Sequence, residues 1–472
     1  MKRRLFILVM VLSIALLLVA PASADFPAPN PAPGEPSWAD YPVLPAGCIV
    51  EPGPGQEFVV CLPEAWNGVL MIYAHGYTSV YPRTPAGPVT PWNLSFEEFG
   101  ALVGTPDTPG LIQTALDTGS AVAMTSYSTH GYAIEQALGD IPLLYQHFYT
   151  NYVLPLNPAA PPPPVIMTGA SEGGLVTTTI LEKVSAGQIS MPVIGGLAAC
   201  GPLAGTEWQV EYLGDFRVWF DHFFSGVLPG NVANVPADTW VGWDPELNDD
   251  PGDADLVGMI SQAIIDDFKH NRGRKTKSLF LLTGAPIDYN FRKADSYYPT
   301  AVQVLYYSIW GTDDLISKAG GQPYDNTDER LLRYLYPYTA DPMAETYLRD
   351  YYAPTGNLAM PLVTLHTTRD PAVPVAHEFI YARRADSAGS SDYLTTLIVP
   401  RYGHCNFRPY ELQIALWLLQ NQISQTLPAA LSEGATAEEP VFEAAPVDER
   451  MLDNAGIEDV DLTEISEDQL LK

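Results

Sequence analysis

Cationic side chains are scarce in this sequence. Its 472 residues include 24 Lys and Arg against 55 Asp and Glu, a formal net charge of −31. Nucleic acids and anionic lipids are both bound through Lys and Arg, so this balance argues against either as a partner. A charge of this size mainly favours solubility. The length allows a large core with an inserted domain, and a hydrophobic content of 47% is ordinary for a globular protein.

Motifs for bound cofactors are also missing. The sequence contains no zinc-type cluster, no P-loop and no dinucleotide fingerprint, so neither a metal nor a cofactor is predicted. An acidic stretch at 248–255 suggests Ca²⁺, but it lacks the spacing and the terminal Glu of an EF-hand loop. A solvated acidic turn is the favoured interpretation.

Only one apolar run approaches the length of a membrane span. Residues 1–24 combine a positive start at 2–4, an apolar run at 5–19 and a small-residue cleavage site at 22–24, which is typical of a secretory signal. A membrane anchor is the alternative, but the run is short for a span. We expect a secreted protein, extracellular or periplasmic, with no membrane span after signal cleavage.

Cysteine is limited to four residues: Cys48, Cys61, Cys200 and Cys405. In an exported protein, four cysteines suggest two disulfides, for which three pairings are possible. The favoured pairing is Cys48–Cys61, which closes a small N-terminal loop and leaves Cys200–Cys405. Four buried free thiols are the alternative.

Apolar runs alternate with helical spacing on both sides of one long interruption. Runs that are apolar throughout and alternate with helices indicate a mainly parallel sheet covered on both faces, an α/β fold. The interruption is rich in aromatic residues and indicates an inserted, mostly helical cap. The expected divisions are a signal at 1–24, a Pro-rich lead-in at 25–56, core at 57–204, a cap at 205–357, core at 358–427 and an acidic disordered tail at 428–472.

The most informative stretch is Gly169-Ala170-Ser171-Glu172-Gly173. It follows the apolar run 165–167, which predicts a strand, and precedes helical spacing at 175–183. A G-x-S-x-G motif between strand and helix pushes the serine into a strained, exposed position beside the first N–H groups of the helix. A chance match to so short a pattern is the alternative.

A serine nucleophile needs a base and an orienting acid. His404 follows the last apolar run, 394–399, and Asp370 follows the run at 361–366. Both therefore lie, like Ser171, at the carboxyl edge of the predicted sheet, where parallel sheets bind ligands. Asp370 could instead cap a helix, and Asp313 or Asp314 are rival acids inside the predicted cap. His75 is expected to shape a turn, and the other six histidines are interpreted as surface or structural residues.

These motifs, with His75-Gly76-Tyr77 after an early strand, resemble the α/β-hydrolase superfamily over about 57–425. The resemblance implies Ser171 as nucleophile, His404 as general base and then acid, and Asp370 as the orienting carboxylate. It also implies an oxyanion hole from the backbone N–H groups of Tyr77 and Glu172. The Glu172 carboxylate is expected to face away from the substrate.

A closer resemblance, to secreted tannase and feruloyl esterase enzymes, is incomplete. Those enzymes brace the catalytic serine and histidine loops with a disulfide whose cysteine directly precedes the serine. Here Ala170 stands at that position, whereas Cys405 directly follows His404. Cys200, at the end of the neighbouring predicted strand, could supply a similar brace.

The sequence thus predicts a secreted serine hydrolase that cleaves carboxylic esters of small molecules. An exopeptidase of the same fold, resembling prolyl and tripeptidyl aminopeptidases and acting on peptides, is the main alternative. A non-catalytic binding protein is a third interpretation, although such proteins usually lose a member of the triad.

Overall fold

The computed structural model describes residues 45, 47–78, 102–105, 108–235, 256–288, 290–328, 330–426 and 458–459. The predicted signal, nearly all of the predicted lead-in before Cys48, the acidic stretch at 248–255 and all but two residues of the predicted tail lie outside the described residues. Within them, no helix combines the length and apolar character needed to cross a membrane.

Nine strands form one sheet in the order β1-β2-β6-β3-β7-β8-β9-β10-β11. Their bounds are β1 Cys48–Gly53, β2 Gln56–Cys61, β3 Leu70–Ala74, β6 Ala121–Thr125, β7 Val165–Ala170, β8 Val193–Ala199, β9 Leu362–Arg369, β10 Leu394–Tyr402 and β11 Glu458–Asp459. Two further short strands, β4 (Gly104–Thr105) and β5 (Thr108–Pro109), pair only with each other.

The strands from β6 to β10 in this order are all parallel. Strands β1, β2 and β11 extend the sheet by antiparallel pairing. After β3 the chain turns outward to β6 and then returns to place β7 on the other side of β3. This reversal is a topological switch point, and side chains that follow β3 and β7 meet in the crevice it creates.

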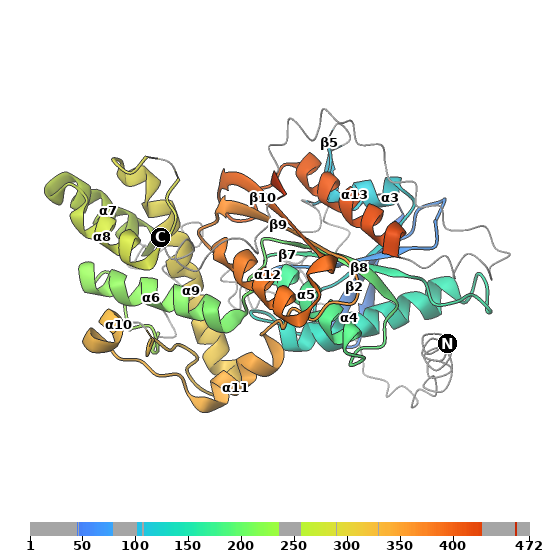
Figure 1. Cartoon of the computed structure of the whole chain (residues 1–472), viewed down its shortest axis with the longest axis horizontal. Coiled ribbons are helices and arrows are strands. Elements are labelled where there is room, and N and C mark those ends of the chain that lie inside the picture. The colour runs from blue at the N-terminus through green and yellow to red at the C-terminus, as the bar shows by residue number, and fades with distance from the viewer. Residues whose placement is uncertain are drawn as a thin grey trace, which may run out of the picture.

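Helices cover both faces of the sheet (Figure 1). On one face α3 (Leu111–Asp117) and α13 (Pro409–Thr426) pack on apolar side chains of β7, β8, β9 and β10. On the other face lie α4 (Ile134–Phe148), which continues into the π-turn η2 (Tyr149–Val153), α5 (Glu172–Ser185) and α12 (Ala376–Ala388). A sheet apolar on both faces is therefore buried between two helical layers, as its unalternating apolar runs predict.

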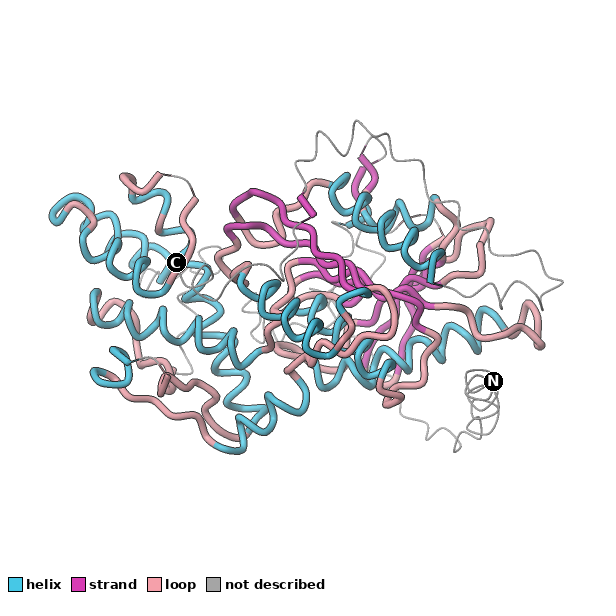
Figure 2. Tube along the Cα trace, viewed as in Figure 1, coloured by secondary structure: helices cyan, strands magenta, loops and turns pink. Residues whose placement is uncertain are grey.

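Between β8 and β9 the described elements are all helical, and they form a separate group at one end of the molecule (Figures 1 and 2). We call them the inserted helices. They are α6 Thr206–Phe223, α7 Leu256–Asn271, α8 Arg274–Thr283, η4 Ala294–Ser296, α9 Tyr298–Ala319, α10 Arg330–Leu335 and α11 Pro342–Tyr351. The structure thus has the predicted fold class, a mainly parallel sheet with helices on both faces and a helical insertion.

Several elements differ from the sequence-based expectation. The sheet begins with β1, inside the predicted lead-in, because Cys48–Gly53 forms a hairpin with β2 in which Cys48 is opposite Cys61. A short 3-10 turn, η5 (Ser391–Tyr393), precedes β10, which runs three residues past the predicted strand end. Two tail residues, Glu458–Asp459, pair with Ile398 and Leu397 of β10. Such strand additions follow from backbone pairing and carry little side-chain signal.

Candidate active site

Ser171 lies in the turn between β7 and α5, with a backbone φ of 55° and ψ of −125°. This φ is uncommon for a residue with a side chain and marks local strain. The two flanking glycines make the turn possible. A Cβ on Gly173 would lie 1.9 Å from the Ala74 carbonyl oxygen, and one on Gly169 would lie 2.2 Å from the Gly173 carbonyl oxygen. Only glycine fits at both positions, so the turn has the backbone geometry of the strand–turn–helix elbow in which G-x-S-x-G motifs occur.

Ser171, His404 and Asp370 are joined in one line of hydrogen bonds. Ser171 Oγ lies 2.8 Å from His404 Nε2, and His404 Nδ1 lies 2.8 Å from Asp370 Oδ2. The three residues follow β7, β10 and β9, so the parallel sheet brings them to one edge although Ser171 and His404 are 233 residues apart. The arrangement can pass a proton from the serine hydroxyl to the imidazole.

Asp370 is fully buried. Its Oδ1 accepts hydrogen bonds from the backbone N–H groups of Ala372 and Val373, both at 2.9 Å, while Oδ2 faces His404. The aspartate therefore both forms the turn before α12 and orients the histidine. The rival acid Asp314 lies elsewhere, where its Oδ2 accepts from Tyr132 N at 2.7 Å and from Lys318 at 3.0 Å.

A second histidine stands behind Asp370. His366 Nδ1 lies 3.0 Å from Glu378 Oε1, and its Nε2 lies 2.8 Å from the Val373 carbonyl oxygen and 3.7 Å from Asp370 Oδ2. Burial lowers the pKa of His366, but the bond to Glu378 and the nearby carboxylates outweigh it and raise the pKa above its ordinary value. The sequence interpretation treated His366 as surface or structural; it is fully buried against the site, a position that only the strand register specifies.

The loop that carries His404 is fixed from both sides. Gly403 N donates to the Arg369 carbonyl oxygen at 3.1 Å. Arg401 makes a two-pronged bond to Glu411 of α13, at 2.8 and 2.6 Å, and this bond raises the pKa of Arg401. Two parallel N–H···O bonds restrict orientation as well as distance. The histidine is thereby held in place by the backbone of β9 and by the first turn of α13.

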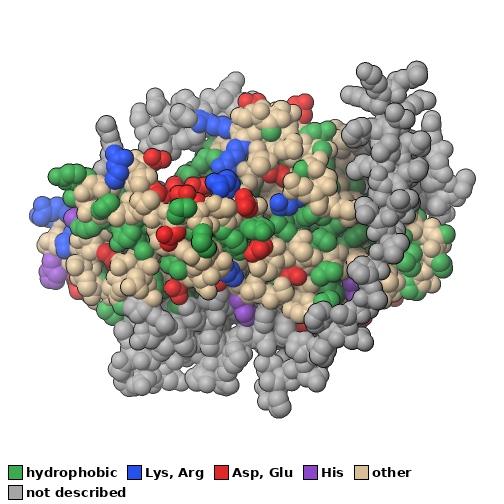
Figure 3. Space-filling view, turned by 90° about the horizontal axis from the view of Figure 1, so that it is seen from below, with side chains coloured by type: hydrophobic (Ala, Val, Ile, Leu, Met, Phe, Trp, Pro, Cys, Tyr) green, Lys and Arg blue, Asp and Glu red, His purple; other side chains and the backbone are tan. Residues whose placement is uncertain are grey.

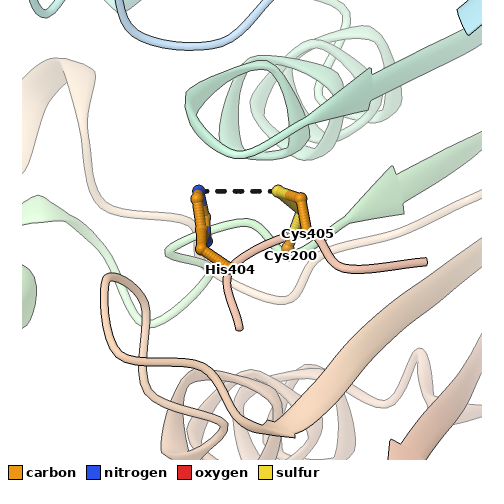
Figure 4. Close-up of side chains that lie close together, drawn as sticks. All are labelled: Cys200, His404 and Cys405. Atoms are coloured by element: carbon orange, nitrogen blue, oxygen red, sulfur yellow. Dashed lines mark hydrogen bonds between the residues drawn. A yellow bond between two sulfur atoms is a disulfide. The ribbon is translucent and has the colours of Figure 1, made fainter. Parts of the chain in front are cut away.

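The Cys200–Cys405 disulfide lies beside the imidazole (Figure 4). It joins the residue after β8 to the residue after His404, and Cys405 Sγ lies 3.5 Å from His404 Nε2. Cys200, His404 and Cys405 are close enough to form a metal-ligand set. Since both sulfurs are in the disulfide, no thiolate is present to bind a metal. The structure also contains the other favoured pairing, Cys48–Cys61.

A small cavity of about 20 Å³ opens in front of Ser171 and His404. This volume accommodates about one water molecule. Its walls come from the segments that follow β3, β8 and β9, from the loop before α4, from the α5 N-terminus and from inserted helices α6 and α9. The residues are Tyr77, Tyr132, Glu172, Pro202, Gln209, Tyr307, Ala372 and Val373. Tyr77 and Glu172, the residues expected to supply backbone N–H groups, thus border the cavity with the serine.

Glu172 directs its carboxylate into the protein. Its side chain is buried, and Oε1 accepts a hydrogen bond from Ala133 N at 2.5 Å. His75, in the turn after β3, is also buried, and its ring lies 3.9 Å from that of Tyr127. Burial lowers the pKa of His75 to about 4, so this histidine is neutral at pH 7.

Inserted helix α6 reaches the Asp370 loop directly. Gln209 Nε2 donates to the Ala372 carbonyl oxygen at 2.6 Å, and Tyr212 donates to the Pro371 carbonyl oxygen at 2.9 Å. His377 Nδ1 accepts from Ala204 N, so its Nε2–H donates to Gln209 Oε1 at 2.7 Å. No sequence motif marks Gln209, Tyr212 or Tyr307; Tyr307 belongs to the aromatic residues that make the insertion stand out in the sequence.

The strand order, the elbow and the chain order Ser171, Asp370, His404 together define an α/β-hydrolase fold. No family model matches the sequence, and none of the curated proteins matches it.

Among solved structures, the chain is similar to lipase A of Candida antarctica, at 14% identity and a TM-score of 0.41, over 79% of this chain and 74% of the lipase. It is similar to the rice cell wall degrading esterase LipA of Xanthomonas oryzae, at 13% identity and a TM-score of 0.36, over 76% of this chain and 82% of the esterase. A third structure is the acylaminoacyl peptidase of Pyrococcus horikoshii, at 12% identity and a TM-score of 0.35, over 78% of this chain and 39% of the peptidase. At these scores the fold assignment depends on the topology and the elbow.

Proposed function

We propose that this protein is an exported serine hydrolase that cleaves carboxylic esters through an acyl-enzyme on Ser171. The observation that carries the proposal is the continuous line of 2.8 Å contacts from Ser171 Oγ through His404 to Asp370. A serine on a strained elbow with such a base is the arrangement that acyl transfer requires. Export is supported by the sequence of residues 1–24 and by the two disulfides.

In the first step, His404 Nε2 takes the Ser171 proton as Oγ bonds to the ester carbonyl carbon. The same proton then passes to the leaving alcohol, and the acyl group stays on Ser171. Water then attacks the acyl carbon and gives a proton to Nε2. As the carbon–Oγ bond breaks, Nε2 passes that proton to Ser171 Oγ, so the acid leaves and the serine hydroxyl is restored. Asp370 keeps the Nδ1–H of His404 pointed toward itself and stabilises the imidazolium that forms in each step.

In each step the carbonyl oxygen becomes negatively charged. We assign the backbone N–H groups of Tyr77 and Glu172 as the hydrogen-bond donors that stabilise this oxyanion. Support comes from their place at the cavity and from α5, which begins at Glu172 and presents its first N–H groups there. One such donor contributes roughly 3–4 kcal/mol of transition-state stabilisation. Tyr77 adds a hydroxyl that is buried and has no hydrogen-bond partner among the described residues, and is available to a substrate oxygen.

Substrate entry requires the tyrosine rings above the serine to move, because the cavity holds about one water. Tyr77 packs edge-on against Tyr132 at 5.3 Å and Tyr307 at 5.8 Å between ring centroids. Tyr307 belongs to α9, so movement of the inserted helices would open the site. The aromatic walls favour a bulky or aromatic acyl or alcohol group.

An exopeptidase is the alternative from the same fold, and it needs a carboxylate that faces the cavity to hold a free amine. Glu172 borders the cavity, but its Oε1 is bonded to Ala133 N. Asp314 is bonded to Lys318 and Tyr132 N. Both acids are therefore engaged within the protein, which favours the esterase. The non-catalytic interpretation is disfavoured because Ser171, His404 and Asp370 are all present and hydrogen-bonded in line.

The test is labelling of the mature protein with an active-site fluorophosphonate, with release assays on p-nitrophenyl esters and aminoacyl nitroanilides. We expect labelling of wild type and of the control Ser185→Ala, and none of Ser171→Ala. The Ser185 hydroxyl donates to the Leu181 carbonyl and accepts from Ala359 N, and it does not line the cavity. Ester turnover with labelling supports the esterase. Anilide turnover would select the peptidase, and an unlabelled, folded wild type would rule out both.

A further inference from the structure

Helix α8 exposes a face that contains cations and leucines and no acid. At 3.6 residues per turn, Thr276, Leu279 and Phe280 share its inner side, and all three are buried. The outer side carries six residues, which we call the α8 outer face: Arg274, Lys275, Lys277, Ser278, Leu281 and Leu282. Leu281 is 84% exposed and Leu282 is 45% exposed.

The surrounding sequence reverses the charge balance of the chain. Residues 256–296 contain seven Lys or Arg and four Asp, whereas the whole chain has 24 and 55. One of the four acids, Asp267, is buried, and its Oδ2 accepts from the backbone and hydroxyl of Thr276, both at 2.9 Å. Figure 3 shows Lys and Arg side chains at the left edge, the end at which Figure 1 places α7 and α8, and also near the middle of the same face.

A second apolar and cationic group adjoins this helix. Phe291 is 57% exposed, the Arg292 guanidinium lies 5.3 Å from its ring centroid, and Lys293 follows. Tyr297 links the two segments, because its hydroxyl donates to the Phe291 carbonyl oxygen at 3.0 Å and its ring lies 4.9 Å from that of Phe280. Phe291, Arg292 and Lys293 are thus joined to α8 through Tyr297 and the inner-side residue Phe280.

We propose that the α8 outer face, with Phe291 to Lys293, docks on an anionic lipid surface. Cations that flank exposed leucines on one helix face match the boundary between headgroups and acyl chains: the ammonium and guanidinium groups meet lipid phosphates, and the apolar side chains enter below them. The net charge of −31 predicts no such docking, but the structure gathers cations at one end. Anionic lipids repel the rest of the protein, which is acidic, so the protein would approach the lipid surface with this face.

The docking face is connected to the loop of His404. The segment after α8 passes Pro286, whose carbonyl oxygen accepts from Thr300 Oγ1 at 2.8 Å. The same hydroxyl lies 2.8 Å from that of Tyr402, two residues before His404. A lipid surface at α8 would therefore present its molecules beside the inserted helices that cover the cavity.

Binding of the mature protein to vesicles of phosphatidylcholine, with and without phosphatidylglycerol, tests this proposal by co-sedimentation at low and high salt. Each cation near an anionic surface contributes about 1 kcal/mol, or about fivefold in partitioning. We expect Arg274→Gln/Lys275→Gln/Lys277→Gln to weaken binding to the anionic vesicles on the order of 100-fold. Leu281→Gln/Leu282→Gln should weaken it several-fold, and high salt should act like the triple variant.

Matched controls change the same residue types elsewhere. Leu156→Gln/Leu331→Gln removes leucines that are 72% and 48% exposed, and Lys183→Gln/Arg333→Gln/Arg349→Gln removes three cations of α5, α10 and α11. Both should bind like wild type, and all variants should keep their turnover of a soluble ester. Equal binding to both vesicle types, no binding by folded wild type, or equal loss in the controls would overturn the proposal. Binding to dextran sulfate but not to vesicles would assign the face to an anionic polymer instead.

Discussion

The carboxyl edge of the sheet and inserted helix α6 differ in what surrounds their charged side chains. At the edge, Asp370 has two backbone donors and His404, and His366 is held between Glu378 and the Val373 carbonyl. On inserted helix α6, Glu207, Glu211 and Asp215 follow one another at four-residue spacing. Burial, and then these neighbouring carboxylates, raise the pKa of Glu211 to about 8.

This difference separates what the two regions do for the molecule. The edge matches each charge with a partner, so its groups are held in the geometry that chemistry needs. On α6, Glu207, Glu211 and Asp215 lie on successive turns, and their mutual repulsion costs stability when they ionise. We therefore expect changes at the edge to affect turnover and changes in α6 to affect pH-dependent stability.

The largest expected effect comes from Asp370→Asn. Loss of the orienting charge should lower kcat for a p-nitrophenyl ester by about 10⁴-fold, as in other triads of this type. The matched change in the insertion, Asp314→Asn, should keep most of the activity. Circular dichroism checks that both variants fold. Equal loss of turnover in the two variants would mean that Asp370 has no special role.

The two disulfides give the next contrast. Cys200 and Cys405 are separated by 205 residues, a loop that contains all the inserted helices, whereas Cys48 and Cys61 are separated by 13. Loop-closure entropy predicts losses of about 5 and about 3 kcal/mol on replacing each pair by serine. Only Cys200→Ser/Cys405→Ser should also reduce kcat, because it frees the His404 loop. Urea unfolding and ester turnover measure both effects, and an equal fall in kcat in the two variants would contradict the bracing role.

The pKa of His75 predicts how the stability of the folded protein changes at low pH. Its pKa is about 4 in the folded protein against 6.5 when unfolded, so the unfolded chain binds a proton first. Stability contributed by neutral His75 is present above pH 6.5 and is lost as pH falls through about 4, a total of about 3 kcal/mol. His75→Gln should flatten this part of the pH profile in urea titrations, whereas His270→Gln, on exposed α7 surface, should leave it unchanged.

The last expected effect concerns the insertion and is measured as a change in Tm. The pKa of Glu211 is raised to about 8 in the folded protein, against 4.5 when unfolded. The stability that protonated Glu211 contributes is therefore fully present below pH 4.5 and is lost as the pH rises through about 8. Glu211→Gln should therefore raise Tm by a few degrees at pH 8 and leave it nearly unchanged at pH 5. The exposed Glu345→Gln serves as control. A stabilisation that does not grow with pH would show that repulsion on α6 is negligible.

The sequence alone determined the parts of this protein that depend on short stretches of chain. A tight turn needs Gly169 and Gly173 on either side of Ser171, and that pattern is visible without a structure. The placement of Asp370 and His404 at one edge was inferred because they follow apolar runs by four and five residues, and parallel strands end at one edge. The Cys200–Cys405 pairing followed as the remainder once Cys48–Cys61 was assigned to a small loop. Asp370 could have capped a helix instead of facing a histidine. It faces His404, and its other oxygen bonds the turn before α12, whose N-cap is Val375.

Tertiary structure decided what depends on register and on helix faces. β1 and β11 join the sheet by backbone pairing, which has little side-chain signature. The pairing of His366 with Glu378 requires β9 and α12 to pack at one particular offset. The cations of the α8 outer face cannot be recognised from the net charge of −31, because that value sums over the whole chain, whereas folding places these cations together on one face. Local geometry can be inferred from sequence, whereas the contacts between distant segments and the charge of a single face exist only once the chain has folded.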